Sequence, residues 1–301
     1  MSDRIQVLAA RVSAGDTLSD RDIDMLADST DILTLGMLAD DARRRVHGTD
    51  TTYVRVHQVE LATVSGGVTI PPSAGEVRVS GAWTSAPETL AALRAVVAAA
   101  GQTPVSAFSL ADLEQAADAG EELTLADILH AVRHAGVSLI ADAPIDQLTT
   151  AEASLDTVRA AGLGLARLTV AHNGDLAARI AVLKRAAQLQ HALGWIRSFA
   201  PLPRQWDLAL PTTGYEDVRQ VALARLVADN IPSIQVDWAL YGPKLAQVAL
   251  TVGADDVDGV SASDQAPDGR RRSPIEEIKR NIQAAALVPV ERDGVYGRLG
   301  A

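Results

Sequence analysis

Three aspartates in the last fifty residues are the groups best placed to do chemistry. Asp255, Asp256 and Asp258 stand at the start of a short apolar run over residues 257–260. Because successive side chains of a strand point to opposite faces, Asp256 and Asp258 would share one side of a regular strand. Paired carboxylates serve acid–base or metal-assisted chemistry. The same pattern is also typical of a capped, solvated turn that enters a strand, and both interpretations stand.

A second group of polar and aromatic residues lies at or beyond the ends of other expected strands. His172 could line a pocket there, and Arg204 could bind a carboxylate. Tryptophan rings could stack on a planar ligand, although gap filling is the commoner role for any one tryptophan. Trp206 has a similar position. The candidate ligand-binding residues are therefore Trp83, His172, Arg204, Trp238, Asp256 and Asp258; no catalytic residue is assigned.

The other histidines offer little chemistry. His130 and His134 have the i, i+4 spacing of metal ligands, but the residues between them lack the glutamate of an HExxH motif. They are expected on the outer surface of a helix. His57 and Glu60 are spaced for opposite faces of a strand, which favours a structural role, and no metal site is expected.

The elements that must position these residues alternate between strands and helices. Strand-like runs are expected at 53–61, 76–80, 105–108, 137–141, 166–170, 196–200, 234–238 and 257–260. Helical periodicity occupies 87–100, 124–135, 175–193 and 215–229, and residues 64–74 read as a loop. This alternation predicts right-handed βαβ units and a (β/α) TIM-barrel-like fold, whole or partly opened. Residues 1–50 are expected to form a helical extension packed on a barrel of residues 51–301, as one structural unit.

The bulk composition limits the partners. The net charge of −11 argues against a general nucleic-acid or anionic-membrane surface. The arginine run at 270–272 is a local exception, which we interpret as a solvated loop. No apolar run is long enough to span a bilayer and no secretory pattern is seen at the N-terminus, so a cytoplasmic location is expected.

Several segments together resemble one enzyme family. They are IPSIQ at 231–235, GPKLAQVAL at 242–250, GADDVDG at 253–259 and PVERDGVY at 289–296, with LGMLA at 35–39 and RRRVHG at 43–48 near the N-terminus. Their order and spacing resemble aminofutalosine synthase and cyclic dehypoxanthinyl futalosine synthase. These are radical S-adenosylmethionine (SAM) enzymes of the futalosine route to menaquinone.

This chain differs from the family in the segments that supply the family's cofactor ligands and catalytic residues. The family's CxxxCxxC loop follows the first strand, where this chain reads QVELATVSGG at 58–67, and the chain contains no cysteine. The glycine-rich turn for SAM is VSGAW at 79–83, and the Gly-His-x-Glu element is AHNG at 171–174. Since an Fe–S cluster is held by thiolates, we expect no cluster and no bound SAM.

Two roles follow from the resemblance and its gaps. The first is a pseudoenzyme that binds a small-molecule intermediate of the pathway, or a related active enzyme of the pathway. The alternative is a non-radical enzyme that uses Asp256, Asp258 and His172 at the barrel mouth.

Overall fold

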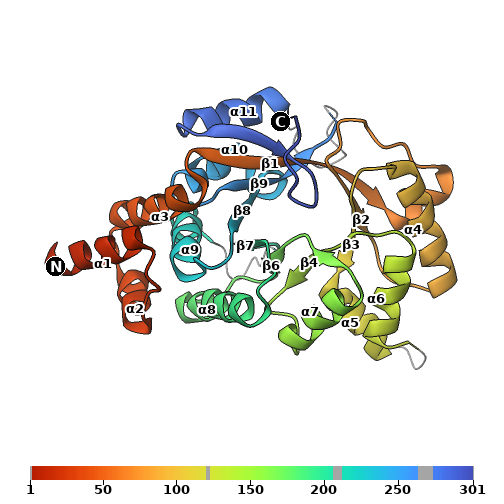
Figure 1. Cartoon of the computed structure of the whole chain (residues 1–301), viewed down its shortest axis with the longest axis horizontal. Coiled ribbons are helices and arrows are strands. Elements are labelled where there is room, and N and C mark those ends of the chain that lie inside the picture. Colours follow the sequence, from red (N-terminus) through yellow and green to blue (C-terminus); the bar gives the residue numbers. More distant parts are fainter. Residues whose placement is uncertain (1, 120–122, 206–211, 264–273, 301) are drawn as a thin grey trace.

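The computed structural model describes residues 2–119, 123–205, 212–263 and 274–300. In this part of the chain, eight parallel strands close into a barrel (Figure 1). In ring order they are β1 (Asp50–Glu60), β2 (Glu76–Ser80), β3 (Val105–Ser109), β4 (Leu139–Pro144), β6 (Leu168–Val170), β7 (Ser198–Pro203), β8 (Ser233–Asp237) and β9 (Asp256–Ser261). The barrel is therefore whole.

Strand β1 closes the ring and receives one further strand. Thr52 of β1 pairs with Asp256 of β9, and the C-terminal half of β1 pairs with β2 from Val56 onward. The N-terminal half of β1 also pairs with β10 (Val288–Arg292). The two-residue β5 (Gly164–Leu165) extends the edge of β4. The last strand of the chain thus enters beside the first one, at the amino ends of the barrel strands.

The helices surround the barrel or extend it at the N-terminus. They are α1 (Ser2–Ala14), α2 (Asp20–Asp28), α3 (Ile32–His47), α4 (Ala86–Ala100), α5 (Leu110–Ala119), α6 (Leu125–His134), α7 (Ala151–Ala160), α8 (Leu176–Leu193), α9 (Gly214–Val227), α10 (Trp238–Leu250) and α11 (Ile275–Ala284). A 3₁₀ turn, η1 (Leu61–Gly66), follows β1. In Figure 1, α1 to α3 lie together on one side of the barrel, and α3 packs against α9.

Local sequence explains where several helices begin. Thr124 and Asp127 form a reciprocal capping box at the start of α6, as Thr213 and Glu216 do for α9. Helix α10 is kinked at Gly242, whose φ of 78° is followed by Pro243. These caps fix the residues at which α6 and α9 begin.

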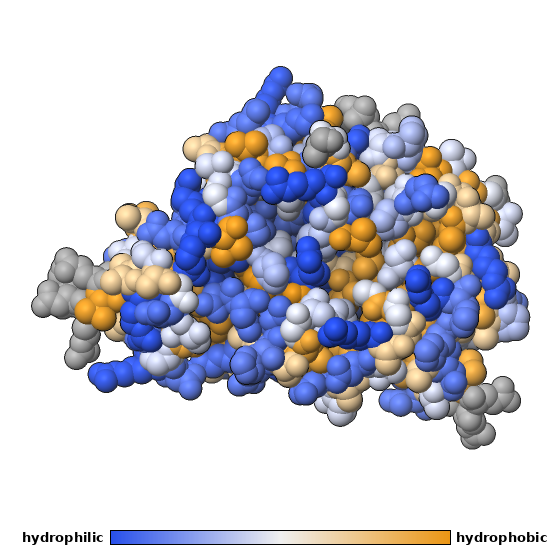
Figure 2. Space-filling view, in the orientation of Figure 1, coloured by the Kyte–Doolittle hydropathy of each residue, from blue (hydrophilic) through white to orange (hydrophobic). Residues whose placement is uncertain are grey.

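The expected elements agree with the structure to within a few residues. Strands β5 and β10 and helix α11 were not expected, and no ranges were predicted for α5, α7 and α10. The 3₁₀ turn η1 takes up the start of the expected loop at 64–74. Trp206 and the arginines at 270–272 lie outside the described residues. No helix among the described residues combines the length and apolarity needed to cross a membrane. On the face shown in Figure 2, hydrophobic side chains are interspersed with hydrophilic ones.

Candidate functional site

Strand β2 shows how the sequence fills the barrel with polar groups. Val77 and Val79 alternate with Glu76 and Arg78, and both valines belong to the hydrophobic core. Because neighbouring side chains of a strand point to opposite faces, Glu76 and Arg78 face the barrel interior. Their contacts confirm this direction, since they reach residues of β3 and β9 and the residue before β6.

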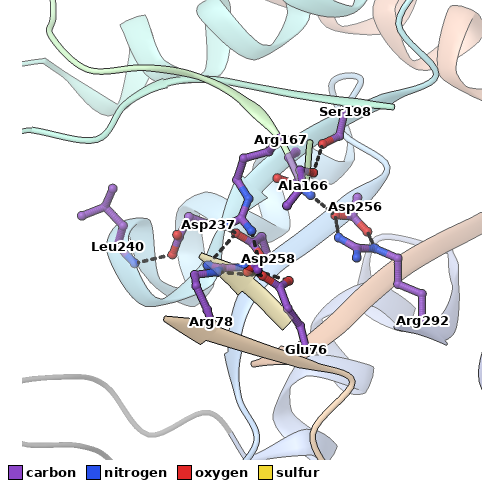
Figure 3. A network of polar contacts seen from close by, with 12 residues as sticks. Glu76, Arg78, Ala166, Arg167, Ser198, Asp237, Leu240, Asp256, Asp258 and Arg292 are labelled. Atoms are coloured by element: carbon purple, nitrogen blue, oxygen red, sulfur yellow. Dashed lines mark hydrogen bonds and ion pairs between the residues drawn. The ribbon is translucent and has the colours of Figure 1, made fainter. Parts of the chain in front are cut away.

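Two arginines and two carboxylates form a closed network in the interior (Figure 3). Arg78 donates to Glu76 Oε1 at 2.9 Å and to Asp258 Oδ1 at 2.8 Å. Arg167 donates to Asp258 Oδ2 at 2.8 Å and to Glu76 Oε1 at 3.0 Å. Ser106 adds a hydrogen bond to Glu76 Oε1 at 2.5 Å. Each carboxylate therefore bridges both arginines.

The network shifts the pKa of its members strongly. Burial raises the pKa of Glu76, but the charges of Arg78 and Arg167 outweigh burial and lower this pKa to about 2. Burial also raises the pKa of Asp258, and the same two arginines bring it well below its usual range. Both carboxyl groups are thus ionised at neutral pH, and their negative charges are matched by two guanidinium groups.

The C-terminal segment closes the amino end of the barrel. Arg292, the last residue of β10, donates to Asp256 Oδ1 and Oδ2 at 2.6 and 2.7 Å. Its guanidinium carbon lies 4.0 Å from the ring centroid of Tyr296. The Tyr296 hydroxyl donates to the Ala166 carbonyl at 3.1 Å and accepts from Gln235 Nε2 at 3.0 Å. Asp256 is therefore a buried anchor for the chain's own tail.

A partly exposed arginine, Arg204, lies at the carboxyl end of the barrel. Arg204, directly after β7, donates to Asp237 Oδ2 at 3.1 Å, and 26% of its side chain is exposed. Burial lowers the pKa of Arg204, but the charges of Asp237, Asp142 and Asp258 outweigh burial and raise it. Arg204 therefore stays charged at the mouth of the barrel.

Asp237 is held in place by backbone geometry. Its Oδ1 caps α10 by accepting from the Leu240 amide at 2.9 Å (Figure 3). Gly259, with φ of 70°, lies against the same carboxylate, and a Cβ there would come within 2.6 Å of Asp237 Oδ1. Only glycine leaves room for Asp237 to cap the helix and meet Arg204 together.

An aromatic pair lies at the carboxyl ends of β2 and β3. The rings of Trp83 and Phe108 make an edge contact with centroids 6.1 Å apart. Phe108 is buried and has a φ of 61°, a conformation that costs a bulky residue about 1 to 3 kcal/mol. The barrel thus holds a strained aromatic group at its mouth, with the partly exposed Trp83 in front of it.

His172 lies apart from these groups. It follows β6, its side chain is 54% exposed, and its Nδ1 is 3.3 Å from Asp146 Oδ2. Asp146 also accepts from the backbone amides of Ala171 and His172, at 2.7 and 2.9 Å. His172 borders a cavity of about 160 Å³ between the ends of β6 and β7 and the helices α8 and α9.

The remaining residues of interest have structural positions. Trp238 is fully buried at the start of α10, with no exposed face for a ligand. His130 and His134 are exposed on α6, and Glu60 accepts a hydrogen bond from Ser80 at 2.7 Å. Burial lowers the pKa of His57. Asp255 is buried and forms an ion pair with Arg225 of helix α9.

The structure does not bring the six candidates together. Asp258 lies in the interior network, Asp256 is paired with Arg292 at the amino end of the barrel, and Trp83 and Arg204 lie at the mouth. His172 borders the separate cavity, and Trp238 is buried. Sequence reasoning missed the partners Glu76, Arg78 and Arg167. The signal for Glu76 and Arg78 was charged residues at alternate positions of a short, otherwise apolar strand.

The residues present do not fit a thiolate-held Fe–S cluster. The chain contains no cysteine. The region after β1 forms η1, where the Thr63 hydroxyl donates to the Glu60 carbonyl at 2.8 Å. In the part of the chain that the structure describes, no group of three or more histidines, aspartates and glutamates is arranged to hold a metal ion.

Comparisons of sequence find relatives along nearly the whole chain. Residues 202–299 match the CofH/MqnC C-terminal region. Aminodeoxyfutalosine synthase of Thermus thermophilus is 29% identical over 360 aligned positions, which cover 97% of this chain and 95% of that protein. A second relative, from Archaeoglobus fulgidus, is 5-amino-6-(D-ribitylamino)uracil–L-tyrosine 4-hydroxyphenyl transferase. It is 36% identical over 134 positions, which cover 40% of this chain and 39% of the relative.

Comparisons of structure find the same type of barrel. Methylornithine synthase (PylB) superposes with a TM-score of 0.69 at 11% identity, covering 94% of this chain and 97% of that one. HydG, a maturase of the [FeFe]-hydrogenase, superposes with a TM-score of 0.67 at 11% identity, covering 96% and 76%. At these identities the likeness shows the fold alone.

The comparisons also correct one expectation. The aminodeoxyfutalosine synthases among the sequence relatives are radical SAM enzymes, which use an Fe–S cluster and SAM, so the expectation that this protein takes neither cofactor is contradicted. That expectation depended on missing ligand residues alone, whereas the barrel and the C-terminal region of the relatives are both retained. This chain resembles the radical SAM enzymes of the futalosine pathway in sequence over nearly its whole length. Its closed barrel agrees with that resemblance.

Proposed function

We propose that this protein binds a small anionic intermediate of the futalosine route at the carboxyl end of its barrel. The observation that carries the proposal is the exposure of Arg204, whose side chain is 26% accessible. The interior arginines Arg78, Arg167 and Arg292 are only 10%, 2% and 3% accessible, and their partners belong to this chain. Arg204 is thus the interior-facing arginine best able to receive a carboxylate from outside.

The position of the aromatic pair indicates the shape of the ligand. Trp83 follows β2, whereas Arg204 follows β7, and these two strands lie far apart in the ring order. A ligand that touches both must therefore be elongated, with an anionic group at one end and a planar group at the other. The resemblance to the family implies a planar aromatic carboxylate as ligand, so aminodeoxyfutalosine, the compound after which the Thermus relative is named, is the compound we choose for the test.

The alternative of a non-radical acid–base enzyme has less support. The pKa of Asp258 lies well below its usual range, because the two arginines outweigh the opposing effect of burial. Asp256 is fully buried, and both of its oxygens accept from Arg292. A general acid or base needs a pKa near the working pH, which argues against Asp258, and Asp256 is argued against by its burial and its two bonds to Arg292.

Binding of aminodeoxyfutalosine to purified protein, followed by calorimetry, tests the proposal. Arg204→Met should weaken binding about ten- to a hundredfold, because a hydrogen bond to a charged group contributes about 1.5 to 3 kcal/mol. Arg204→Lys should retain part of the affinity. Arg298→Gln is the control, because Arg298 pairs with Asp50 on the surface. If wild-type protein does not bind this compound, or Arg204→Met binds it as well, the proposal is wrong.

We also propose that residues 1–50 and the barrel of residues 51–301 form one structural unit. Helix α3 packs against α9, and Arg43 of α3 is fully buried. His47 Nε2 lies 2.7 Å from the Pro232 carbonyl, which joins the end of α3 to the start of β8. These contacts support a helical extension that packs on the outside of the barrel. Limited proteolysis that released a stable 51–301 fragment would contradict this proposal.

A further inference from the structure

The cavity between α8 and α9 is separate from the barrel interior. It is formed by the ends of β6 and β7 and by the first turns of the two helices. Its volume of about 160 Å³ is close to that of a cavity that holds one benzene molecule. The apolar part of its wall consists of Val170, Ala178, Val182, Pro201, Leu202 and Pro203. The cavity therefore suits the body of a small aliphatic or aromatic molecule.

One wall of this cavity contains an acceptor that lacks a partner. Asp217 of α9 is 5% exposed, and its Oδ1 is buried and makes no hydrogen bond. Its Oδ2 accepts from the Thr212 hydroxyl at 3.3 Å. Burial raises the pKa of Asp217. Buried carboxylate oxygens in folded proteins nearly always have a partner, so a donor is missing at this wall.

A guanidinium group lies in the same wall. Arg179 of α8 donates to Asn173 Oδ1 from Nε and Nη2, at 2.9 and 2.6 Å, and from Nε to the Gly174 carbonyl at 3.0 Å. These bonds fix the guanidinium beside the cavity. Asp146, also at the wall, already accepts from two backbone amides. Asp217 and Arg179 therefore supply opposite charges to the lining of a small, mainly apolar space.

We propose that this cavity binds a small aliphatic α-amino acid, with its ammonium group at Asp217 and its carboxylate at Arg179. The side chain of the ligand then lies against the apolar wall. An amine without a carboxylate leaves Arg179 unused, and a carboxylate without an amine leaves Asp217 Oδ1 without a donor. A zwitterion with a short apolar side chain satisfies both groups.

Three probes that share the same branched alkyl group separate these contributions. They are L-leucine, isoamylamine, which lacks the carboxylate, and 4-methylpentanoate, which lacks the amine. Calorimetry on the full chain should give the tightest binding for L-leucine, at least tenfold weaker binding for isoamylamine, and the weakest for 4-methylpentanoate. Equal binding of all three probes, or no binding of L-leucine at millimolar concentration, would overturn the proposal.

Matched variants test the two contacts. Asp217→Asn should remove the preference for L-leucine over 4-methylpentanoate, and Arg179→Met should remove its preference over isoamylamine. Asp118→Asn, on the exposed face of α5, is the charge control and should bind L-leucine like wild type. Arg204→Met should also leave L-leucine binding unchanged, which separates this site from the barrel mouth. If Asp217→Asn is folded by circular dichroism and keeps the preference, the assignment of the ammonium contact is wrong.

Discussion

Replacing Asp258 by asparagine tests whether the interior network holds the barrel together. Asp258 accepts from Arg78 at 2.8 and 3.3 Å and from Arg167 at 2.8 Å. Asparagine keeps the shape but removes the negative charge, which leaves two buried guanidinium groups with Glu76 as their remaining charged partner. Removing one member of a buried ion pair costs about 3 to 5 kcal/mol.

This cost converts to a measurable change in melting temperature. At about 2.1 cal/mol/K of unfolding entropy per residue, a 301-residue chain loses about 1.6 °C per kcal/mol, so the expected decrease is about 5 to 8 °C. Calorimetry and chemical denaturation should agree on the sign and the size. Arg298→Gln, which removes an exposed pair, should cost less than about 1 kcal/mol.

A double variant shows whether charge balance is the cause. Arg167→Met together with Asp258→Asn removes one charge of each sign and leaves Arg78 paired with Glu76. Its cost should be smaller than the sum of the two single costs by at least about 1 kcal/mol. Additive costs, or an Asp258→Asn effect no larger than that of Arg298→Gln, would refute the reasoning.

Three further predictions concern other parts of the barrel. The pKa of Glu76 falls from 4.5 to about 2 on folding, so the stabilisation that ionised Glu76 contributes is fully present above about pH 4.5 and is lost as the pH falls towards 2. The difference in free energy of unfolding between wild type and Glu76→Gln should shrink over that range. A constant difference would contradict this prediction. Tyr296→Phe should lower the free energy of unfolding by about 2 kcal/mol in urea titrations, because two hydrogen bonds are lost; no change would mean that the tail does not seal the barrel. Gly259→Ala should lower the melting temperature more than Gly101→Ala. Both glycines have a positive φ, but of the two only Gly259 would place a Cβ against a neighbour, the Asp237 carboxylate. Equal effects of the two substitutions would rule out the clash.

The barrel could be predicted from the sequence because each strand carries its own signal. The run at 76–80 matches β2 residue for residue, and the expected helices end within two residues of the observed ones. Strand β10 was missed because residues 288–292 are short and only partly buried, so they show no regular alternation. Its place is set by pairing with β1, more than 200 residues earlier.

The candidate site was less predictable because its contacts join distant parts of the chain. Alternation correctly placed Asp256 and Asp258 on one side of β9. It could not show that their partners are Arg292 and Arg78, since nothing local marks a residue 36 or 180 positions away. The cavity beside Asp217 depends on how two helices pack, which no single segment encodes.

The tail that seals the barrel has a consequence for how the protein is made. Asp256 forms its ion pair with Arg292, and Gln235 donates to the hydroxyl of Tyr296, so both partners are synthesised after all eight strands of the ring. The strands can therefore come together during translation before the segment that covers their amino ends has been made. Until that segment reaches the barrel, Asp256 lacks the Arg292 cation and Gln235 lacks the Tyr296 hydroxyl.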